Sequence, residues 1–359
     1  MTAMMPMMTS PISDKKKVRT LVVDDSVVVR TVIERILNGN PGYSVIHKTS
    51  SAEQALGYLA DNAVDLILLD IELPGQSGLA ALPQILRANP AVKVAILSGK
   101  CEEGSAAAIE ALALGASDIL SKPGSGSFGD QFPQALIDRL NRLFGDRPAV
   151  PPISPVSMPS VEAAPAPLAC IGIGASTGGI HALGQLFQGL SAPLGVPLLL
   201  TQHLPASFTV YFAQQLSRMT SLRVKVAETG DLLAPDIIYV APGDANIQVR
   251  RGLHGRVTIM LNPERTAAGN LPGVDPMFAS MADAYGAGAA GIVLTGMGRD
   301  GTLGARAIVA AGGWIVAQDE ASSVVWGMPG SVAGAGLTCA VMEPLAMMNF
   351  VARRGKVAA

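Results

Sequence analysis

The sequence contains few aromatic residues, little net charge and no long hydrophobic run. Aromatic residues make up 4% of its 359 residues, and 26 Lys and Arg stand against 28 Asp and Glu, a formal net charge of −2. A chain without excess positive charge has no overall attraction to nucleic acid or to an anionic membrane. No apolar run approaches the roughly 18 residues that a membrane-spanning helix requires. We therefore expect no nucleic-acid partner and no membrane insertion.

Cysteine is also scarce. Cys101, Cys170 and Cys339 cannot all pair and show no C-x-x-C spacing, which disfavours both a disulfide scaffold and a zinc ribbon. The N-terminal segment places methionines ahead of Lys15–Lys17, the reverse of the order in a signal peptide. Together these features predict a cytoplasmic protein.

The chain is long enough for two domains of about 150 residues each, and its hydrophobic content of 49% is enough for packed cores. Seven prolines lie between residues 146 and 167, a density that favours extended structure over helix or sheet. We therefore expect a disordered tail at 1–17, a first domain at 18–144, a proline-rich linker at 145–167 and a second domain at 168–354.

Short apolar runs alternate with helical patterns throughout the first domain, which predicts an α/β fold around a five-stranded parallel sheet. Polar residues follow the first, third, fourth and fifth of these strands: Asp24 and Asp25, Asp70, Ser98, and Lys122. The carboxyl ends of parallel strands meet at one edge, where ligands bind. Three carboxylates gathered there would repel one another unless a cation such as Mg²⁺ joined them. Each aspartate taken singly could equally be a helix N-cap or a turn residue.

This arrangement closely resembles the receiver domain of two-component response regulators, over residues 18–144. The resemblance implies a flavodoxin-like fold in which Asp70 accepts a phosphoryl group from a histidine kinase. It also implies that Asp24, Asp25, Asp70 and the main-chain carbonyl of Glu72 hold Mg²⁺, and that Ser98 and Lys122 contact the phosphoryl group. One departure is that Ile119 or Leu120 stands where the family often has an aromatic switch residue.

The second domain opens with a glycine-rich turn around a serine. Gly174–Gly179 follows an expected strand at 168–173 and precedes a helix, and it contains the G-x-S-x-G pattern of a nucleophile elbow centred on Ser176. A dinucleotide-binding loop would need Gly or Ala where Thr177 stands, and no lysine follows to make a phosphate-binding loop. A serine nucleophile is therefore favoured over nucleotide binding.

A nucleophilic serine needs a base, and the chain has four histidines. His47 lies in the first domain, and His181 lies one turn into the helix after Ser176, where it points away. His254 lies in the expected tip of a β-hairpin, where side chains are usually solvated. His203 directly follows a strand, which places it on the same sheet edge as Ser176 and makes it the leading candidate.

Asp300 follows another strand and a glycine-rich turn on that edge, where it could orient the base, cap a helix, or do both. The resulting order is Ser, His, Asp. An α/β-hydrolase would have the order Ser, Asp, His. That alternative would require His254 as the base, with Asp231, Asp236 or Asp244 as the acid.

Several segments of the second domain resemble the signature blocks of chemotaxis protein-glutamate methylesterases. The blocks are Ala175–Gly179, Thr201–Pro205, Val274–Phe278, Leu294–Gly301 and Ala317–Pro329. The resemblance implies a doubly wound α/β catalytic domain with a β-hairpin, acting on glutamyl methyl esters of methyl-accepting chemoreceptors. In some members the enzyme also deamidates receptor glutamines.

Carried over to this sequence, the resemblance implies that Ser176 is the nucleophile, His203 the base and Asp300 the orienting acid. It also implies that Thr177 and Met297 line the site, that the main chain of Met297 is a candidate oxyanion donor, and that the esterase needs no cofactor. The sequence departs from the family at Asn246, where a histidine is common. A receiver joined to an esterase is expected to cover the catalytic edge at rest and to release it on phosphorylation. The alternative outside enzymology is a degenerate esterase that acts as a phosphorylation-dependent adaptor.

Overall fold

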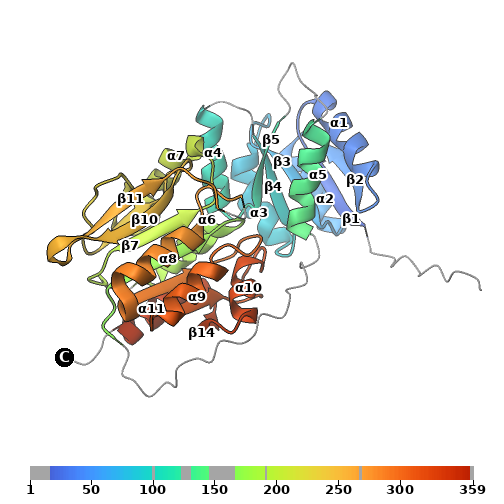
Figure 1. The fold of residues 1–359 in the computed structure, drawn as a ribbon. Coiled ribbons are helices and arrows are strands. Elements are labelled where there is room, and N and C mark those ends of the chain that lie inside the picture. Colours follow the sequence, from blue (N-terminus) through green and yellow to red (C-terminus); the bar gives the residue numbers. More distant parts are fainter. Residues whose placement is uncertain are drawn as a thin grey trace, which may run out of the picture.

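The computed structural model contains two parallel β-sheets, each with helices on both faces (Figure 1). It describes residues 17–98, 102–122, 131–144, 166–190, 192–266 and 269–355. The expected tail lies outside these residues except for Lys17, and the expected linker except for its last two residues. Among the described residues, no helix is both long and apolar enough to cross a bilayer.

The first sheet has five parallel strands in the order β2-β1-β3-β4-β5, as the alternation of runs predicted. Its strands are β1 (Val18–Val23), β2 (Tyr43–Thr49), β3 (Leu66–Asp70), β4 (Lys93–Ser98) and β5 (Asp118–Ser121). Its helices are α1 (Val27–Asn38), α2 (Ala52–Asp61), α3 (Gly78–Ala88), α4 (Glu102–Ala113) and α5 (Gln131–Phe144). Serines cap the first three helices: the hydroxyl groups of Ser26, Ser51 and Ser77 each accept a main-chain N–H bond.

The second sheet has seven parallel strands in the order β14-β13-β12-β6-β7-β9-β8. These are β6 (Cys170–Ala175), β7 (Leu198–Gln202), β8 (Arg223–Val226), β9 (Ile237–Val240), β12 (Ala289–Val293), β13 (Trp314–Gln318) and β14 (Thr338–Met342). An antiparallel hairpin, β10 (Asn246–Arg251) and β11 (Val257–Asn262), forms a separate sheet close to the predicted position. A short 3₁₀ turn, Leu253–Gly255, joins its strands.

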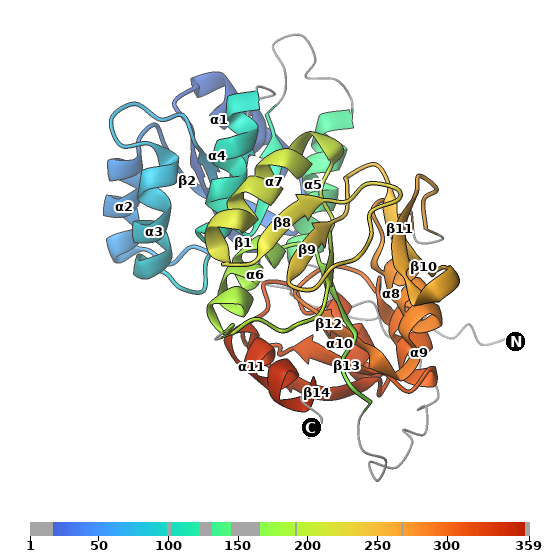
Figure 2. The ribbon, with the colours of Figure 1, turned by 90° about the vertical axis from the view of Figure 1, so that its left-hand side faces the viewer.

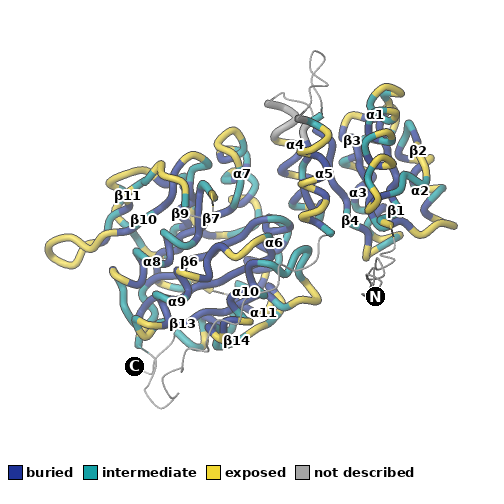
Figure 3. Tube along the Cα trace, turned by 45° about the vertical axis from the view of Figure 1, so that its right-hand side comes forward, coloured by how far each residue is buried: buried dark blue, intermediate teal, exposed yellow. Residues whose placement is uncertain are grey.

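Helices cover both faces of this second sheet (Figure 2). They are α6 (Gly179–Gln188), α7 (Ala206–Met219), α8 (Val274–Tyr285), α9 (Thr302–Ala310), α10 (Met328–Gly334) and α11 (Pro344–Gly355), with a 3₁₀ turn at Gly286–Gly288. Side chains of α6, α7 and α11 pack in one apolar cluster, and those of α8, α9 and α10 in another. The five inner strands between them are almost wholly buried (Figure 3), which explains their continuous apolar sequence.

Two details differ from the sequence prediction. The strand expected at 168–173 is β6, Cys170–Ala175, so Gly174 and Ala175 belong to the sheet rather than to the turn. The sequence analysis also missed β8 and β14, the two edge strands of the second sheet. Each is four or five residues long and partly exposed, so neither shows the apolar run that marked the central strands.

The two domains pack against each other through α4 of the first and α6 and α7 of the second. One continuous apolar cluster crosses this boundary and includes Ala108 and Ile109 from α4 with Ile180 and Phe212 from the second domain. Of the two residues at the expected aromatic switch position, Ile119 is half-buried and packs against the same cluster, whereas Leu120 is buried in another apolar cluster. Burial of apolar side chains from both domains at this boundary favours the packed arrangement.

Close packing of α8 on α9 generates a stability prediction. A Cβ atom added at Gly304 would lie 2.5 Å from the Cβ of Phe278 and 2.7 Å from the main-chain oxygen of Asp275. Gly304→Ala is therefore expected to reduce the free energy of unfolding by about 1–3 kcal/mol through overpacking, measurable by thermal or urea unfolding. The matched control is Gly334→Ala in α10, where nothing lies within 4 Å. Equal stability losses in the two variants would contradict this packing.

Candidate active site and acidic cluster

The first sheet brings the predicted acidic residues together at the ends of its strands. Ligand oxygens of Asp24, Asp25 and Asp70 lie within 4.8 Å of one another. Asp24 and Asp70 are buried, and Asp25 is exposed. Lys122 Nζ lies 2.6 Å from Asp70 Oδ2 and 3.0 Å from Asp24 Oδ2. These contacts explain how buried carboxylates are tolerated, since a paired charge costs far less to bury than an isolated one.

The three carboxylates of this cluster face a single lysine, Lys122, so their negative charge is only partly balanced. Burial raises the pKa of Asp70, and the nearby Asp24 carboxylate adds to the increase, while Lys122 opposes both. The Oδ2 atom of Asp24 is buried and receives no hydrogen bond of good geometry, although the Lys122 ammonium is near it. An unsatisfied carboxylate oxygen beside two further carboxylates is the type of donor set that a hard divalent cation accepts.

The remaining predicted residues of this site lie around the cluster. Ser98 is the last residue of β4, is buried, and its main-chain oxygen accepts a hydrogen bond from Lys122 N. Glu72 is exposed, and its main-chain N–H donates to Asp70 Oδ1 at 3.1 Å. The topology thus gathers at one edge the residues that the strand-end rule predicted there.

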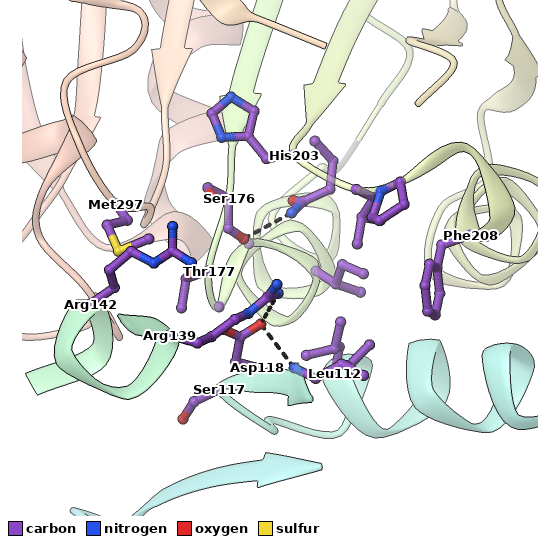
Figure 4. Close-up of a pocket in the computed structure, with 17 residues that line it drawn as sticks. Leu112, Ser117, Asp118, Arg139, Arg142, Ser176, Thr177, His203, Phe208 and Met297 are labelled. Carbon is purple, nitrogen blue, oxygen red and sulfur yellow. Dashed lines mark hydrogen bonds and ion pairs between the residues drawn. The ribbon is translucent and has the colours of Figure 1, made fainter. Parts of the chain in front are cut away.

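In the second domain, Ser176 lies at a sharp turn from β6 into α6. Gly178 has a positive φ of 75°, a conformation that glycine adopts at little cost. A Cβ atom at that position would also lie 2.5 Å from Val324. The Ser176 main chain is held on two sides, because its N–H donates to Thr295 O and its carbonyl accepts from Gln202 Nε2. The serine side chain lines a cavity of about 260 Å³ (Figure 4).

His203 directly follows β7 and lines the same cavity. Its Nε2 atom lies 2.8 Å from Asp300 Oδ2, and the Asp300 side chain is fully buried. An ionised Asp300 accepts a hydrogen bond from Nε2–H, and in this tautomer Nδ1 of the ring carries no proton and can act as a base. No hydrogen bond joins the Ser176 hydroxyl to His203 in this structure, and such contacts are often long before substrate binds.

Main-chain N–H groups surround the Asp300 carboxylate. Val274 N donates to Oδ2 at 2.8 Å, while Asp275 N and Gly301 N donate to Oδ1 at 3.1 and 3.0 Å. Burial raises the pKa of Asp300, but the bonds from His203 and the main chain outweigh burial and hold the pKa below its ordinary value. The carboxylate therefore stays ionised and can stabilise a protonated His203.

Asp275 is a neighbour of this pair that the sequence analysis did not single out. Its Oδ1 atom accepts a hydrogen bond from Gly304 N at 2.8 Å. Burial, together with the charge of Asp300, raises the pKa of Asp275 to about 6. Two adjacent carboxyl groups with pKa values displaced in opposite directions are typical of functional sites.

The other candidate base, His254, lies elsewhere. It is exposed in the 3₁₀ turn of the hairpin with a φ of 63°. Asp231 is bonded to Lys225 and to Glu228 N, and Asp236 to the main chain of Leu194 and Gly195. The third candidate acid, Asp244, is exposed and has no bond to His254. The described residues thus pair His203 with an acid and leave His254 without one.

Thr177 and Met297 also line the cavity, as expected (Figure 4). The opposite wall comes from the first domain and includes Ser117, Asp118, Arg139 and Arg142. The sheet edge that carries Ser176 and His203 is therefore covered by the first domain in this structure.

One ion pair shapes this wall. Arg139 donates two hydrogen bonds of 2.7 Å to the Asp118 carboxylate. Bidentate pairing fixes both side chains in one orientation. The first domain therefore presents a rigid polar surface to the cavity.

Two interdomain contacts escaped the sequence analysis. His181 Nδ1 lies 3.0 Å from the main-chain oxygen of Ala113 in α4. At the boundary between the domains, Lys93 Nζ donates a hydrogen bond of 3.1 Å to the main-chain oxygen of Val324. Burial lowers the pKa of Lys93. A lysine at a strand start and a histidine on a helix carry no sequence signal for this role, because the partners are main-chain atoms of the other domain.

Comparisons with known proteins agree with this architecture. Residues 171–351 match the model of the CheB methylesterase family, and residues 20–127 match that of the response regulator receiver domain. A protein-glutamate methylesterase/protein-glutamine glutaminase of Caulobacter vibrioides is 40% identical over 94% of this chain and 99% of its own. A protein of the same name from Paramagnetospirillum magneticum is 36% identical over 96% of this chain and 98% of its own.

Among solved structures, the CheB methylesterase catalytic domain of Thermotoga maritima is similar with a TM-score of 0.50 and 31% sequence identity. The match covers 52% of this chain and 99% of that one. The chain therefore belongs to the CheB methylesterase family and carries a receiver domain ahead of its catalytic domain.

Proposed function

We propose that this protein is a phosphorylation-regulated methylesterase that hydrolyses glutamyl methyl esters on chemoreceptors and so serves chemosensory adaptation. One contact carries the proposal: the His203 Nε2–Asp300 Oδ2 hydrogen bond, in the wall of a cavity that also contains Ser176. The curated relatives are named for the same reaction and for glutamine deamidation. We place the receiver at 18–144, the linker at 145–167 and the catalytic domain at 168–354.

In the proposed mechanism, His203 Nδ1 takes the Ser176 proton while the serine oxygen attacks the ester carbonyl. The carbon–oxygen bond to methoxide then breaks, the imidazolium proton passes to methoxide, and methanol leaves. Water then attacks the acyl-serine and gives one proton to His203. As the acyl–oxygen bond breaks, His203 passes this proton to the Ser176 oxygen, and the glutamic acid product leaves and ionises in solvent. Asp300 stabilises the imidazolium at each step. Deamidation follows the same path with ammonia as the leaving group.

The oxyanion formed during attack needs donors near Ser176. Thr177 and Met297 line the cavity together with the serine, and α6 begins directly after the turn. Main-chain N–H groups at a helix N-terminus favour developing negative charge. We assign the main chain of Met297 as a donor in this proposal.

The receiver residues fit a magnesium-dependent phosphorylation site. We propose that Asp24, Asp25, Asp70 and the Glu72 carbonyl hold Mg²⁺, which when bound would neutralise the carboxylates and the phosphoryl oxygens. Asp70 would accept the phosphoryl group from a chemotaxis histidine kinase. Ser98 and Lys122 would contact the phosphoryl oxygens, and the short Lys122–Asp70 ion pair supports this role for the lysine. The proposal places the protein in the cytoplasm with its receptors and kinase as partners.

Methanol release from methylated receptor membranes tests the catalytic assignment. Ser176→Ala and His203→Ala are each expected to abolish release, because the first removes the nucleophile and the second the base. His254→Ala is the matched control and should release methanol at the wild-type rate, since His254 is exposed and unpaired with an acid. Loss of activity in His254→Ala with retention in His203→Ala would favour the α/β-hydrolase alternative, and no release by the wild type would favour an adaptor.

Removal of the receiver tests the covered active site. A fragment of residues 166–359 is expected to release methanol faster than the unphosphorylated full chain, because Asp118, Arg139 and Arg142 would no longer line the cavity. Initial rates at equal enzyme concentration measure the effect, with the Ser176→Ala fragment as background. A fragment no faster than the full chain would show that the receiver does not inhibit.

Phosphorylation of Asp70 is tested with a small phosphodonor and Mg²⁺. The full chain is expected to accelerate when both are added, whereas Asp70→Asn should stay at its own basal rate because an amide cannot accept the phosphoryl group. Asp61→Asn, which changes an exposed carboxylate at the end of α2, is the control and should accelerate like the wild type. Acceleration of Asp70→Asn would assign the phosphorylated residue elsewhere.

A further inference from the structure

Asn246, the first residue of β10, is buried to 1% exposure. Its side-chain N–H₂ group donates to the main-chain oxygens of Asn262 at 3.2 Å and Glu264 at 2.6 Å. Its side-chain oxygen accepts a hydrogen bond of 2.6 Å from Gly273 N. One amide thus ties together the start of the hairpin, the chain leaving it, and the residue that precedes α8.

Gly273 is directly followed by the residues that hold the Asp300 carboxylate. The N–H of Gly273 points to Asn246, and the next two N–H groups, of Val274 and Asp275, point to Asp300. Asp300 in turn accepts the bond from His203. Three successive main-chain donors therefore link the Asn246 side chain to the imidazole, with no flexible side chain between Gly273 and Asp300.

We propose that Asn246 is a positioning residue that fixes the geometry of the His203–Asp300 pair through the main chain of Gly273, Val274 and Asp275. This inference rests on the proposed use of His203 as the base. The three hydrogen bonds of Asn246 need two N–H donors and one acceptor oxygen. Among side chains, only an amide supplies both. The main chain of Gly273 is closely packed by its neighbours, because an added Cβ there would lie 2.3 Å from Thr266 Cγ2.

A purely structural role would have a different signature. If Asn246 served only to clamp the hairpin, its loss would lower stability and leave the catalytic pair unchanged. Ser280 provides the comparison, because its hydroxyl accepts a hydrogen bond from Val249 N and so joins the same hairpin strand to α8. That contact lies away from Gly273, and no bond of Ser280 reaches Asp300.

The test compares Asn246→Ala and Ser280→Ala in the full chain, by pH dependence of kcat for methanol release and by NMR titration of His203. Asn246→Ala is expected to lower kcat about 10- to 100-fold with little change in KM, since misplacement of a catalytic pair costs this much. The pKa of His203 should fall, because a displaced Asp300 stabilises the imidazolium less. Ser280→Ala should lower the thermal midpoint with unchanged kcat and His203 titration.

Asn246→Asp keeps the proposal testable if Asn246→Ala fails to fold. The carboxylate keeps an oxygen for Gly273 N but loses both donors to the hairpin, so stability should fall while the His203 pKa stays unchanged or rises with the added negative charge. A fall in the His203 pKa in Asn246→Asp, or an unchanged His203 titration and kcat in Asn246→Ala, would overturn the proposal. The titration does not depend on turnover, so it separates failure here from a wild type that releases no methanol.

Discussion

The hydrogen bond between His203 and Asp300 is the contact on which the catalytic domain depends. A buried carboxylate costs free energy unless donors surround it, and here the donors are three main-chain N–H groups and the imidazole. These groups come from distant parts of the chain: the end of β7, the start of α8 and the turn before α9. The sheet holds them together, since β7 and β12 both lie close to the central strand β6.

The same edge of the sheet is where the two domains meet. Val324 takes part in both the turn and the domain contact: its side chain packs near Gly178 in the turn after Ser176, and its carbonyl accepts the hydrogen bond from Lys93 of the receiver. The receiver also supplies one wall of the cavity that holds Ser176. A shift of the receiver would therefore change access to the serine and the packing beside its turn together.

The sequence predicted most of the architecture because central parallel strands are buried on both faces and leave continuous apolar runs. It missed β8 and β14, since an edge strand is partly exposed and carries a weaker pattern. The strand-end rule also gathered Asp24, Asp25, Asp70 and Lys122 correctly, because parallel strands place their carboxyl ends at one edge. Asn246 was noted only as a departure from a family pattern, and nothing in the sequence showed its bond to Gly273.

By itself, the sequence determined two parallel α/β domains, their strand-end residues, and a serine with one well-placed histidine among four. These properties follow from local patterns, which neighbouring residues decide. Only the tertiary structure decided that Asp300 is held by the N-terminus of α8, that Asn246 fixes that terminus, and that the receiver lines the cavity. Each of these depends on hydrogen bonds to main-chain atoms far away in sequence, and a main-chain atom carries no residue identity for a pattern to reveal.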